Sequence, residues 1–232
     1  MREKNWKEWK TLNADVVACR CCSRLVAWRE TVAREKRRAY LEWDYWGKPV
    51  PGFGDRDARL VIIGLAPAAH GANRTGRMFT GDSSGRTLLA AMHRAGFSNL
   101  PSSMHDDDGL VLQDAYLTAV ARCAPPGNRP TAGELANCRP FLKRELQLLD
   151  HTRVVLALGR IAFDGYQRML REDGGISSRL IFEHGASFSF DSTLPALIAC
   201  YHPSRQNTQT GRLTDKMLDQ VFARARYFLD RG

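Results

Sequence analysis

Two groups of cysteines stand far apart in this chain and could together bind a metal. Cys19 and Cys22 lie in ACRCCSRL with Cys21 between them, and Cys123 and Cys138 bracket CAPPGNRPTAGELANC. Four thiolates bind zinc or an iron–sulfur cluster, while unpaired buried thiols are the alternative interpretation. Spacing alone does not decide which of the first three cysteines would be ligands. Such a site would fasten the N-terminal segment onto the rest of the chain.

A glycine-rich loop reads GLAPAAHGANRTGRMFTGDSSG from Gly64 to Gly85 and follows the apolar run RLVII. It contains neither GxxxxGK[ST] nor GxGxxG, which argues against a triphosphate-binding P-loop and a dinucleotide site. Its glycines would let the backbone approach a flat or anionic ligand closely. An ordinary surface connection is the alternative, but a loop this long in a compact domain is more often functional. We therefore expect a ligand pocket here.

The last predicted strand also ends in polar groups. The segment CYHPSRQNTQTGRLT carries His202, Ser204, Arg205 and Asn207, and Pro203 restricts the backbone where the chain leaves the strand. A lone histidine is more often structural than catalytic. Because ligands bind outside the carboxyl ends of parallel strands, a histidine at such a position is a stronger candidate. Both loops are expected at the same edge of one sheet.

Alternating strands and helices must position these loops. Short β-branched, apolar runs predict strands that begin near Arg59, Ala115, Arg153 and Pro195. Helical patterns are expected at 1–46, 83–96, 131–149 and 160–171 and from near Thr214. This alternation predicts an α/β fold in which helices cover both faces of a parallel sheet. HDDDG at 105–109 is expected to be a solvated polar loop.

The helix expected at 131–149 begins with a capping box, since Glu134 follows Thr131 at the required spacing. Its apolar face is formed by Leu135, Cys138, Leu142, Leu146 and Leu149. Cys138 is therefore expected to point inward, as a buried ligand must.

The composition favours a protein that handles nucleic acid. The chain has 232 residues with a net charge of +9, from 34 basic and 25 acidic residues. A phosphodiester backbone attracts such a charge. No secretory signal and no run of transmembrane length is visible, so we expect a cytoplasmic protein with no membrane partner. Structural disulfides are uncommon in that compartment, and Cys200 is expected to be a small core residue.

Taken together, GLAPAAHGANRTGRMFTGD and CYHPSRQNTQTGRLT resemble the two signature motifs of family-5 (type-B) uracil-DNA glycosylases. The resemblance covers nearly the whole chain. It implies a single domain over 1–232, a three-layer α/β/α sandwich around a central, mainly parallel four-stranded sheet. A [4Fe–4S] cluster would fasten the helical segment 1–46 to this domain. The family's cysteine pattern matches Cys19, Cys22, Cys123 and Cys138, which leaves Cys21 outside the cluster.

The same resemblance explains why a polar group is missing from the first motif. Other branches of the superfamily place Asp or Asn at its third position, where that residue positions the attacking water. Here the third position is Ala66, as the family-5 pattern expects, and Leu65 lacks the acidic character that family-4 enzymes show. The chain is thus similar to the branch that works without the usual water-activating residue.

The resemblance implies a monofunctional enzyme that flips uracil out of DNA and hydrolyses its N-glycosidic bond, leaving an abasic site. His202 would donate a hydrogen bond to O2 of the departing base, and Asn73 would hold the water. Phe79 would stack on the base, with Asn128 as a pocket or water ligand. The backbone lining the pocket would be that of Gly64, Leu65, Ala66, Pro67 and Ala68. The DNA phosphates would be held by Ser84, Gly85, Ser204, Arg205 and Asn207.

The implied substrate is double- or single-stranded DNA that contains uracil or another deaminated base such as hypoxanthine, because small alanines leave room in the pocket. A monomer that associates with the nucleoid through its substrate is expected. Two other classes of protein remain open. A DNA-damage binding protein would use the cluster only to hold its structure together and would leave no abasic product. A redox carrier is disfavoured, because polar groups gather at the sheet edge and not around the cysteines.

Overall fold

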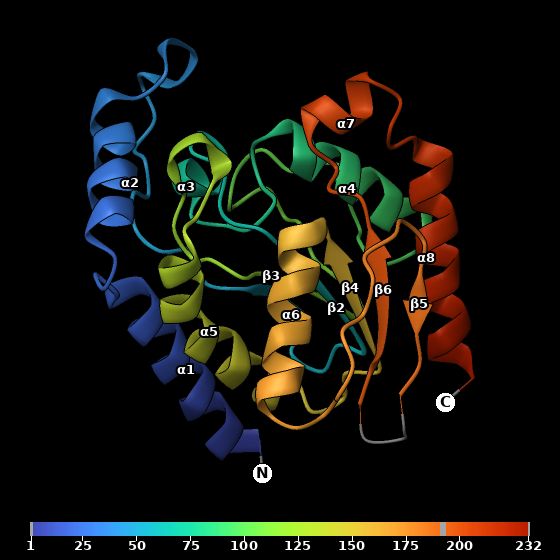
Figure 1. Cartoon of the computed structure of the whole chain (residues 1–232). Coiled ribbons are helices and arrows are strands. Elements are labelled where there is room, and N and C mark those ends of the chain that lie inside the picture. The colour runs from blue at the N-terminus through green and yellow to red at the C-terminus, as the bar shows by residue number, and fades with distance from the viewer. Residues whose placement is uncertain (1, 191–193, 232) are drawn as a thin grey trace.

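A single mixed sheet forms the centre of the computed structural model, which describes residues 2–190 and 194–231. The sheet has six strands in the order β1-β3-β2-β4-β6-β5 (Figure 1). The four inner strands are parallel: β3 (Ala115–Ala119), β2 (Leu60–Gly64), β4 (Val154–Leu158) and β6 (Ala196–Cys200). They are the four strands expected from the sequence. The α/β fold is confirmed.

The expected number of strands was too small, because a short antiparallel strand closes each edge of the sheet. These strands are β1 (Phe53–Gly54), which pairs with β3, and β5 (Ser187–Phe188), which pairs with β6. Each has two residues, and a two-residue strand has no hydrophobic periodicity by which it could be found.

Helices cover both faces of the sheet. The chain forms α1 (Arg2–Ala18), α2 (Ser23–Glu35), α3 (Ala72–Thr75), α4 (Ser83–Arg94), α5 (Ala132–Leu148), α6 (Arg160–Glu172), α7 (Arg205–Gln209) and α8 (Asp215–Asp230). Short 3-10 turns lie at Arg38–Tyr40 and Pro126–Asn128. The N-terminal segment packs on one flank of the molecule, where α1 contacts α5 and α2 contacts α3 (Figure 1).

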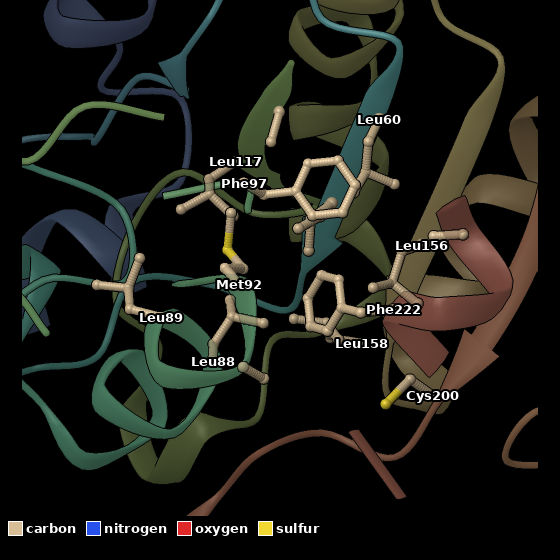
Figure 2. Packing of buried hydrophobic residues seen from close by; sticks show 14 of the residues in the cluster. Leu60, Leu88, Leu89, Met92, Phe97, Leu117, Leu156, Leu158, Cys200 and Phe222 are labelled. Atoms are coloured by element: carbon tan, nitrogen blue, oxygen red, sulfur yellow. The ribbon is translucent and has the colours of Figure 1, made fainter. Parts of the chain in front are cut away.

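Two hydrophobic layers hold these helices to the sheet. Along β2, Leu60 and Ile62 face the layer formed with α4 and α8, while Val61 and Ile63 face the layer formed with α1, α5 and α6. Figure 2 shows the first layer, in which Phe222 packs among the sheet residues. Because both faces are covered, every residue of β2 is buried and the strand is continuously apolar.

The predicted capping box at the start of α5 is confirmed. Thr131 Oγ1 accepts from the Glu134 N–H at 3.2 Å, and a Glu134 carboxylate oxygen accepts from the Thr131 N–H at 2.7 Å. Cys138 is buried as expected. The same helix also buries Glu145, which the apolar face did not predict, because its carboxylate pairs with Arg122 of the segment after β3 at 2.5 Å.

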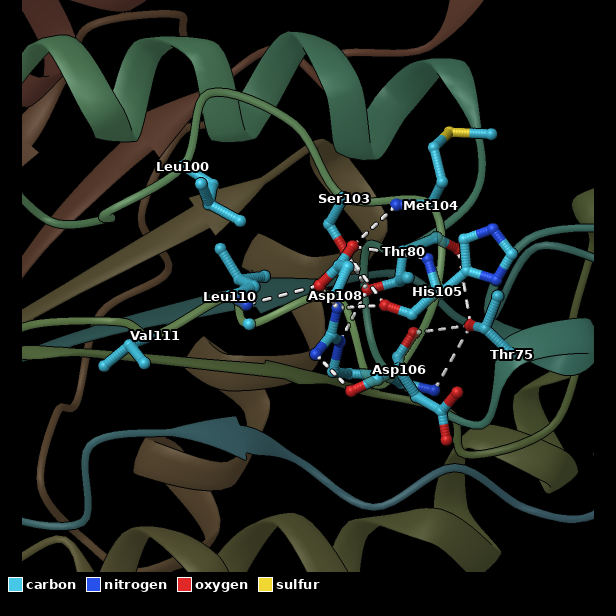
Figure 3. Close-up of polar contacts among 12 residues, drawn as sticks. Thr75, Thr80, Leu100, Ser103, Met104, His105, Asp106, Asp108, Leu110 and Val111 are labelled. Carbon is cyan, nitrogen blue, oxygen red and sulfur yellow. Dashed lines mark hydrogen bonds and ion pairs between the residues drawn. The ribbon is translucent and has the colours of Figure 1, made fainter.

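The acidic loop at 105–109 is not simply solvated, contrary to expectation. Asp108 pairs with the buried guanidinium of Arg77 at 2.5 Å and accepts from the Met104 N–H at 2.9 Å. Ser103 and Thr80 complete this network, as Figure 3 shows. Partial burial alone would raise the pKa of Asp108, but the Arg77 guanidinium, the Ser103 hydroxyl and the Met104 N–H hold it well below its ordinary value. The network fixes the second half of the glycine-rich loop.

A helix that could cross a bilayer is not found within the described ranges, since none combines the necessary length and apolar character.

Candidate active site

A cavity of about 500 Å³ opens at the carboxyl ends of the parallel strands. The glycine-rich loop after β2 forms one wall and the His202 loop after β6 forms another. Its lining includes Leu65, Ala66, Pro67, Ala68, Ala72, Met78, Phe79, Asp82, Ser84, Ala119, Gly127, Asn128, Arg129, Ile161, His202, Ser204 and Gln206. The structure therefore brings the two loops together, as the parallel order of the strands predicts.

Phe79 lines the cavity and has an unusual backbone conformation. Its backbone has φ 54°, a left-handed conformation that costs free energy for a non-glycine residue and that is concentrated at functional sites. Its ring lies over Gly64, at the end of β2, where a Cβ would come within 2.7 Å of the Phe79 ring. Gly64 thus supports the aromatic ring from beneath and does not itself line the cavity. This places the ring where it could stack on a planar ligand.

His202 enters the cavity beside the end of β4. Gly159 has φ +89°, and a Cβ at that position would lie 3.1 Å from the His202 Cβ, so the close approach depends on glycine. Burial lowers the pKa of His202 from 6.5 to about 4. At neutral pH the imidazole is uncharged, and an uncharged imidazole carries one N–H donor. It can therefore donate a hydrogen bond into the cavity without carrying a charge.

The depressed pKa predicts a pH dependence of stability. Between about pH 6.5 and pH 4 the unfolded chain binds a proton at His202 and the folded protein does not, so the free energy of unfolding should fall as the pH falls. Above this window the contribution is constant. At about 1.36 kcal/mol per pKa unit the full loss is at most about 3–4 kcal/mol. Urea unfolding across this window should show a smaller loss for His202→Asn, and identical pH profiles would contradict the assignment.

Asn73 is fully buried and is not among the residues that line the cavity, although its neighbour Ala72 is. Its Nδ2 donates to the carbonyl oxygens of Arg29 and Ala69, each at 3.3 Å. Within the part of the chain that the structure describes, its Oδ1 accepts no hydrogen bond. The amide is therefore oriented by two carbonyls and keeps a buried acceptor. That acceptor is enclosed and lies behind the residues that line the cavity, and the water-holding role stays a prediction.

Asp82 is a cavity residue to which the sequence assigned no role. Its Oδ1 caps α4 by accepting from the Gly85 N–H at 2.8 Å, and burial raises the pKa of its carboxyl. The only signal in the sequence is its place before the helix, as an Asp at an N-cap. Met78 in the glycine-rich loop, Ile161 at the start of α6 and Gln206 in α7 were also missed, because no local pattern says which side chains face the cavity.

The predicted phosphate ligands divide into two groups. Ser84 and Ser204 line the cavity, and Arg205 is exposed beside it. Gly85 is buried with its N–H committed to Asp82. Asn207 supports the His202 loop, since its Nδ2 donates to the His202 carbonyl at 2.8 Å.

Asn128, the predicted pocket or water ligand, lies on the cavity wall in an exposed turn, with φ 57°.

The predicted metal ligands come from the α1–α2 junction, the segment after β3, and α5. Cys123 and Cys138 are buried, Cys19 and Cys22 are half-buried, and Cys21 is exposed. Burial raises the pKa of Cys138 to about 12. Burial is also the main reason why the pKa of Cys123 is raised, and the nearby thiols of Cys19 and Cys22 add to it.

No group of three or more His, Cys, Asp or Glu side chains within residues 2–190 and 194–231 is arranged to hold a metal ion. A zinc ion would need its sulfurs at about 2.3 Å from a single centre. The donor set of four thiols fits an iron–sulfur cluster, in which each cysteine binds a different iron. The cluster itself stays a prediction.

The family follows from comparison with known proteins. A sequence model described as the uracil DNA glycosylase superfamily matches residues 51–226, and the chain belongs to this superfamily. The matched region contains the whole sheet and both loops of the cavity.

Three relatives narrow the similarity to one branch of the superfamily. The chain is 52% identical to a type-5 uracil-DNA glycosylase of Mycobacterium leprae (strain TN), with 93% of each chain covered. It is 51% identical to a type-5 uracil-DNA glycosylase of Thermus thermophilus, over 91% of this chain and 94% of the relative. It is 44% identical to a type-5 uracil-DNA glycosylase of Pyrobaculum aerophilum, over 90% of this chain and 88% of the relative.

Proposed function

We propose that this protein is a uracil-DNA glycosylase that removes uracil from DNA as the first step of repair. The observation that carries the proposal is the cavity at the sheet edge, whose lining includes both the aromatic ring of Phe79 and the uncharged imidazole of His202. The similarity to named type-5 uracil-DNA glycosylases over most of the chain supports the same reaction.

The geometry suggests how the bond is broken. The bond between C1′ of the sugar and N1 of uracil breaks, and its electron pair leaves with the base, so that negative charge develops on O2. The His202 N–H offsets this charge, and one such preorganised donor contributes roughly 3–4 kcal/mol. Water adds to C1′ and its proton is released, and the buried Oδ1 of Asn73 would orient that water. Extruding the base costs a few kcal/mol, which stacking on Phe79 would partly offset.

The walls of the cavity suggest a broader substrate range than uracil alone. Ala66 and Ala68 are small, and the cavity of about 500 Å³ leaves space beside a pyrimidine. We infer that hypoxanthine and related deaminated bases are secondary substrates. Ser84, Ser204 and Arg205 would contact phosphates on either side of the extruded nucleotide, and a monomer can present this face to a duplex.

The proposed [4Fe–4S] cluster would be held by Cys19, Cys22, Cys123 and Cys138. When bound, it would supply two iron–thiolate bonds to the α1–α2 junction, one to the segment after β3 and one to α5. The residues of the cavity would then do the chemistry of excision, and the cluster would hold the helical segment 1–46 in place within a single domain.

Incubation with a uracil-containing duplex, followed by alkali cleavage, tests the function directly. The expected result is cleavage at the uracil position, through an abasic site, and none in the matched thymine duplex. A protein that binds the uracil duplex and leaves no alkali-labile site would be a damage-binding protein, and the proposal would be wrong. The same assay with hypoxanthine measures the wider range.

Replacing Asn73 with alanine should lower the single-turnover rate about tenfold or more, since poor placement of a reactant readily costs this much. Asn99→Ala is a suitable control, because that amide bonds the Gly109 carbonyl in a loop outside the cavity lining. The water-holding role is rejected if the folded Asn73→Ala protein excises uracil as fast as the control.

A further inference from the structure

Arg29 of α2 is a buried cation whose charge is not balanced by a close carboxylate. The residue is 1% exposed. Within the described ranges its one acidic neighbour is Glu30, at 3.9 Å, and that carboxylate is itself paired with Arg20 at 2.5 Å. The closest contact of the guanidinium is instead a thiol, since Nη1 donates to Cys123 Sγ at 3.0 Å. Nη2 donates to the Cys19 carbonyl at 3.3 Å.

The buried guanidinium of Arg29 requires a negative charge near the cysteines that it contacts. Burying an unpaired cation is strongly unfavourable, so buried charges are normally paired or placed beside a metal centre. Cysteines that bind a metal do so as thiolates. Four thiolates on an iron–sulfur cluster would supply the negative charge next to the guanidinium, and Arg29 already contacts two of the four ligand residues.

The backbone of Arg29 contacts the glycine-rich loop that forms one wall of the cavity. Its backbone carbonyl accepts from Asn73 Nδ2 at 3.3 Å, one of the two bonds that orient the Asn73 amide. The chain that follows α2 holds the same short stretch of the loop. The N–H of Trp46 donates to the Arg74 carbonyl at 2.9 Å, and the N–H of Gly47 donates to the Asn73 carbonyl at 3.0 Å. The cysteine site and the glycine-rich loop are thus joined through one residue.

We propose that Arg29 is a positioning residue that links the four-cysteine site to the catalytic loop. Its guanidinium balances the negative charge of the iron–sulfur cluster, and its carbonyl thereby holds the Asn73 amide in the orientation that receives water. The inference has two halves. The catalytic half, the link from Arg29 to Asn73, rests on the proposed function, and the electrostatic half, the charge balance between Arg29 and the cluster, rests on the presence of the cluster. It assigns the cluster an influence on excision that acts through α2.

The test compares Arg29→Gln and Arg29→Lys with Arg34→Gln in the holoprotein. Arg34 lies on the same helix, is exposed, and bonds only the Thr31 hydroxyl among the described residues, so its variant removes the same charge from a solvated position. Three quantities are measured: iron per chain after gel filtration, the reduction potential of the cluster, and the single-turnover rate at saturating enzyme.

Arg29→Gln should lose iron or, where iron is retained, show a more negative reduction potential, because a positive charge and an N–H···S bond are removed. Arg29→Lys keeps the charge and should restore most of the iron content and potential. Arg34→Gln should resemble the wild type. Wild-type iron content and potential in Arg29→Gln would overturn the electrostatic half, whether or not the protein excises uracil.

The catalytic half is decided by a double-mutant cycle. Iron-loaded Arg29→Gln should excise uracil about tenfold more slowly, which is the lower end of the effect of removing a residue that supports a metal ligand. In an Asn73→Ala background the same replacement should have no further effect. Equal losses in both backgrounds would overturn the link to Asn73. Failure of the wild type to excise uracil would refute the proposed function alone, since the iron content and potential are read independently.

Discussion

Replacing His202 with alanine should lower the single-turnover rate of uracil excision from duplex DNA by about a hundred- to a thousandfold. The imidazole enters the cavity beside β4, and with a pKa of about 4 it is uncharged at neutral pH. Ala66 offers no group to activate water, so stabilisation of the leaving uracil anion must supply much of the rate. Loss of one preorganised donor to a developing anion costs a factor of this size.

The same variant distinguishes leaving-group stabilisation from a loss of folding or of DNA binding. The affinity for uracil-containing duplex should change far less than the rate. The defect should also shrink with 5-fluorouracil, which departs more readily as an anion and needs the donor less. His93→Ala, at the far end of α4 from the cavity, should keep the wild-type rate. Full activity of His202→Ala would show that another group stabilises the departing base.

Replacing Glu145 with alanine should destabilise the protein by about 3–5 kcal/mol, the usual cost of leaving one partner of a buried ion pair alone. Both partners are almost inaccessible, with 1% exposure each for Arg122 and Glu145. The Glu145 carboxylate also accepts from the Tyr116 hydroxyl at 3.1 Å and from the Thr118 hydroxyl. Denaturant unfolding should therefore show a large fall in the free energy of unfolding.

A neighbouring surface pair provides the control for this experiment. Arg139 and Glu172 lie 2.9 Å apart, but the Glu172 side chain is half exposed, so Glu172→Ala should cost less than about 1 kcal/mol. The double replacement Arg122→Met with Glu145→Leu should recover much of the loss, because apolar residues of similar volume can replace a buried pair. A cost below about 1 kcal/mol for Glu145→Ala would mean that water reaches Arg122.

Much of the fold is a local property of the sequence. RLVII becomes β2 because five consecutive apolar residues suit a strand covered on both faces, and Thr131 with Glu134 starts α5 because their side chains satisfy its first N–H groups. The meeting of the two functional loops also follows from sequence order. Strands separated by helices run parallel, and their carboxyl ends share one edge.

The details of the site depend on contacts between distant segments. Asp108 can be half-buried because it pairs with Arg77, and Glu145 can be buried because it pairs with Arg122. Nothing in either local pattern distinguishes these carboxylates from solvated ones. The edge strands β1 and β5 exist only because a neighbouring strand offers free hydrogen-bonding groups.

The sequence by itself therefore determined the α/β architecture, the sheet edge at which the two functional loops meet, and the types of residue in those loops. It could do so because periodicity, capping and strand order are encoded over short stretches. Only the tertiary structure decided that His202 is uncharged, that Asp82 faces the cavity, and that Arg29 joins Cys123 to Asn73. Burial and pairing are properties of surroundings, and those surroundings are assembled from segments far apart in the chain.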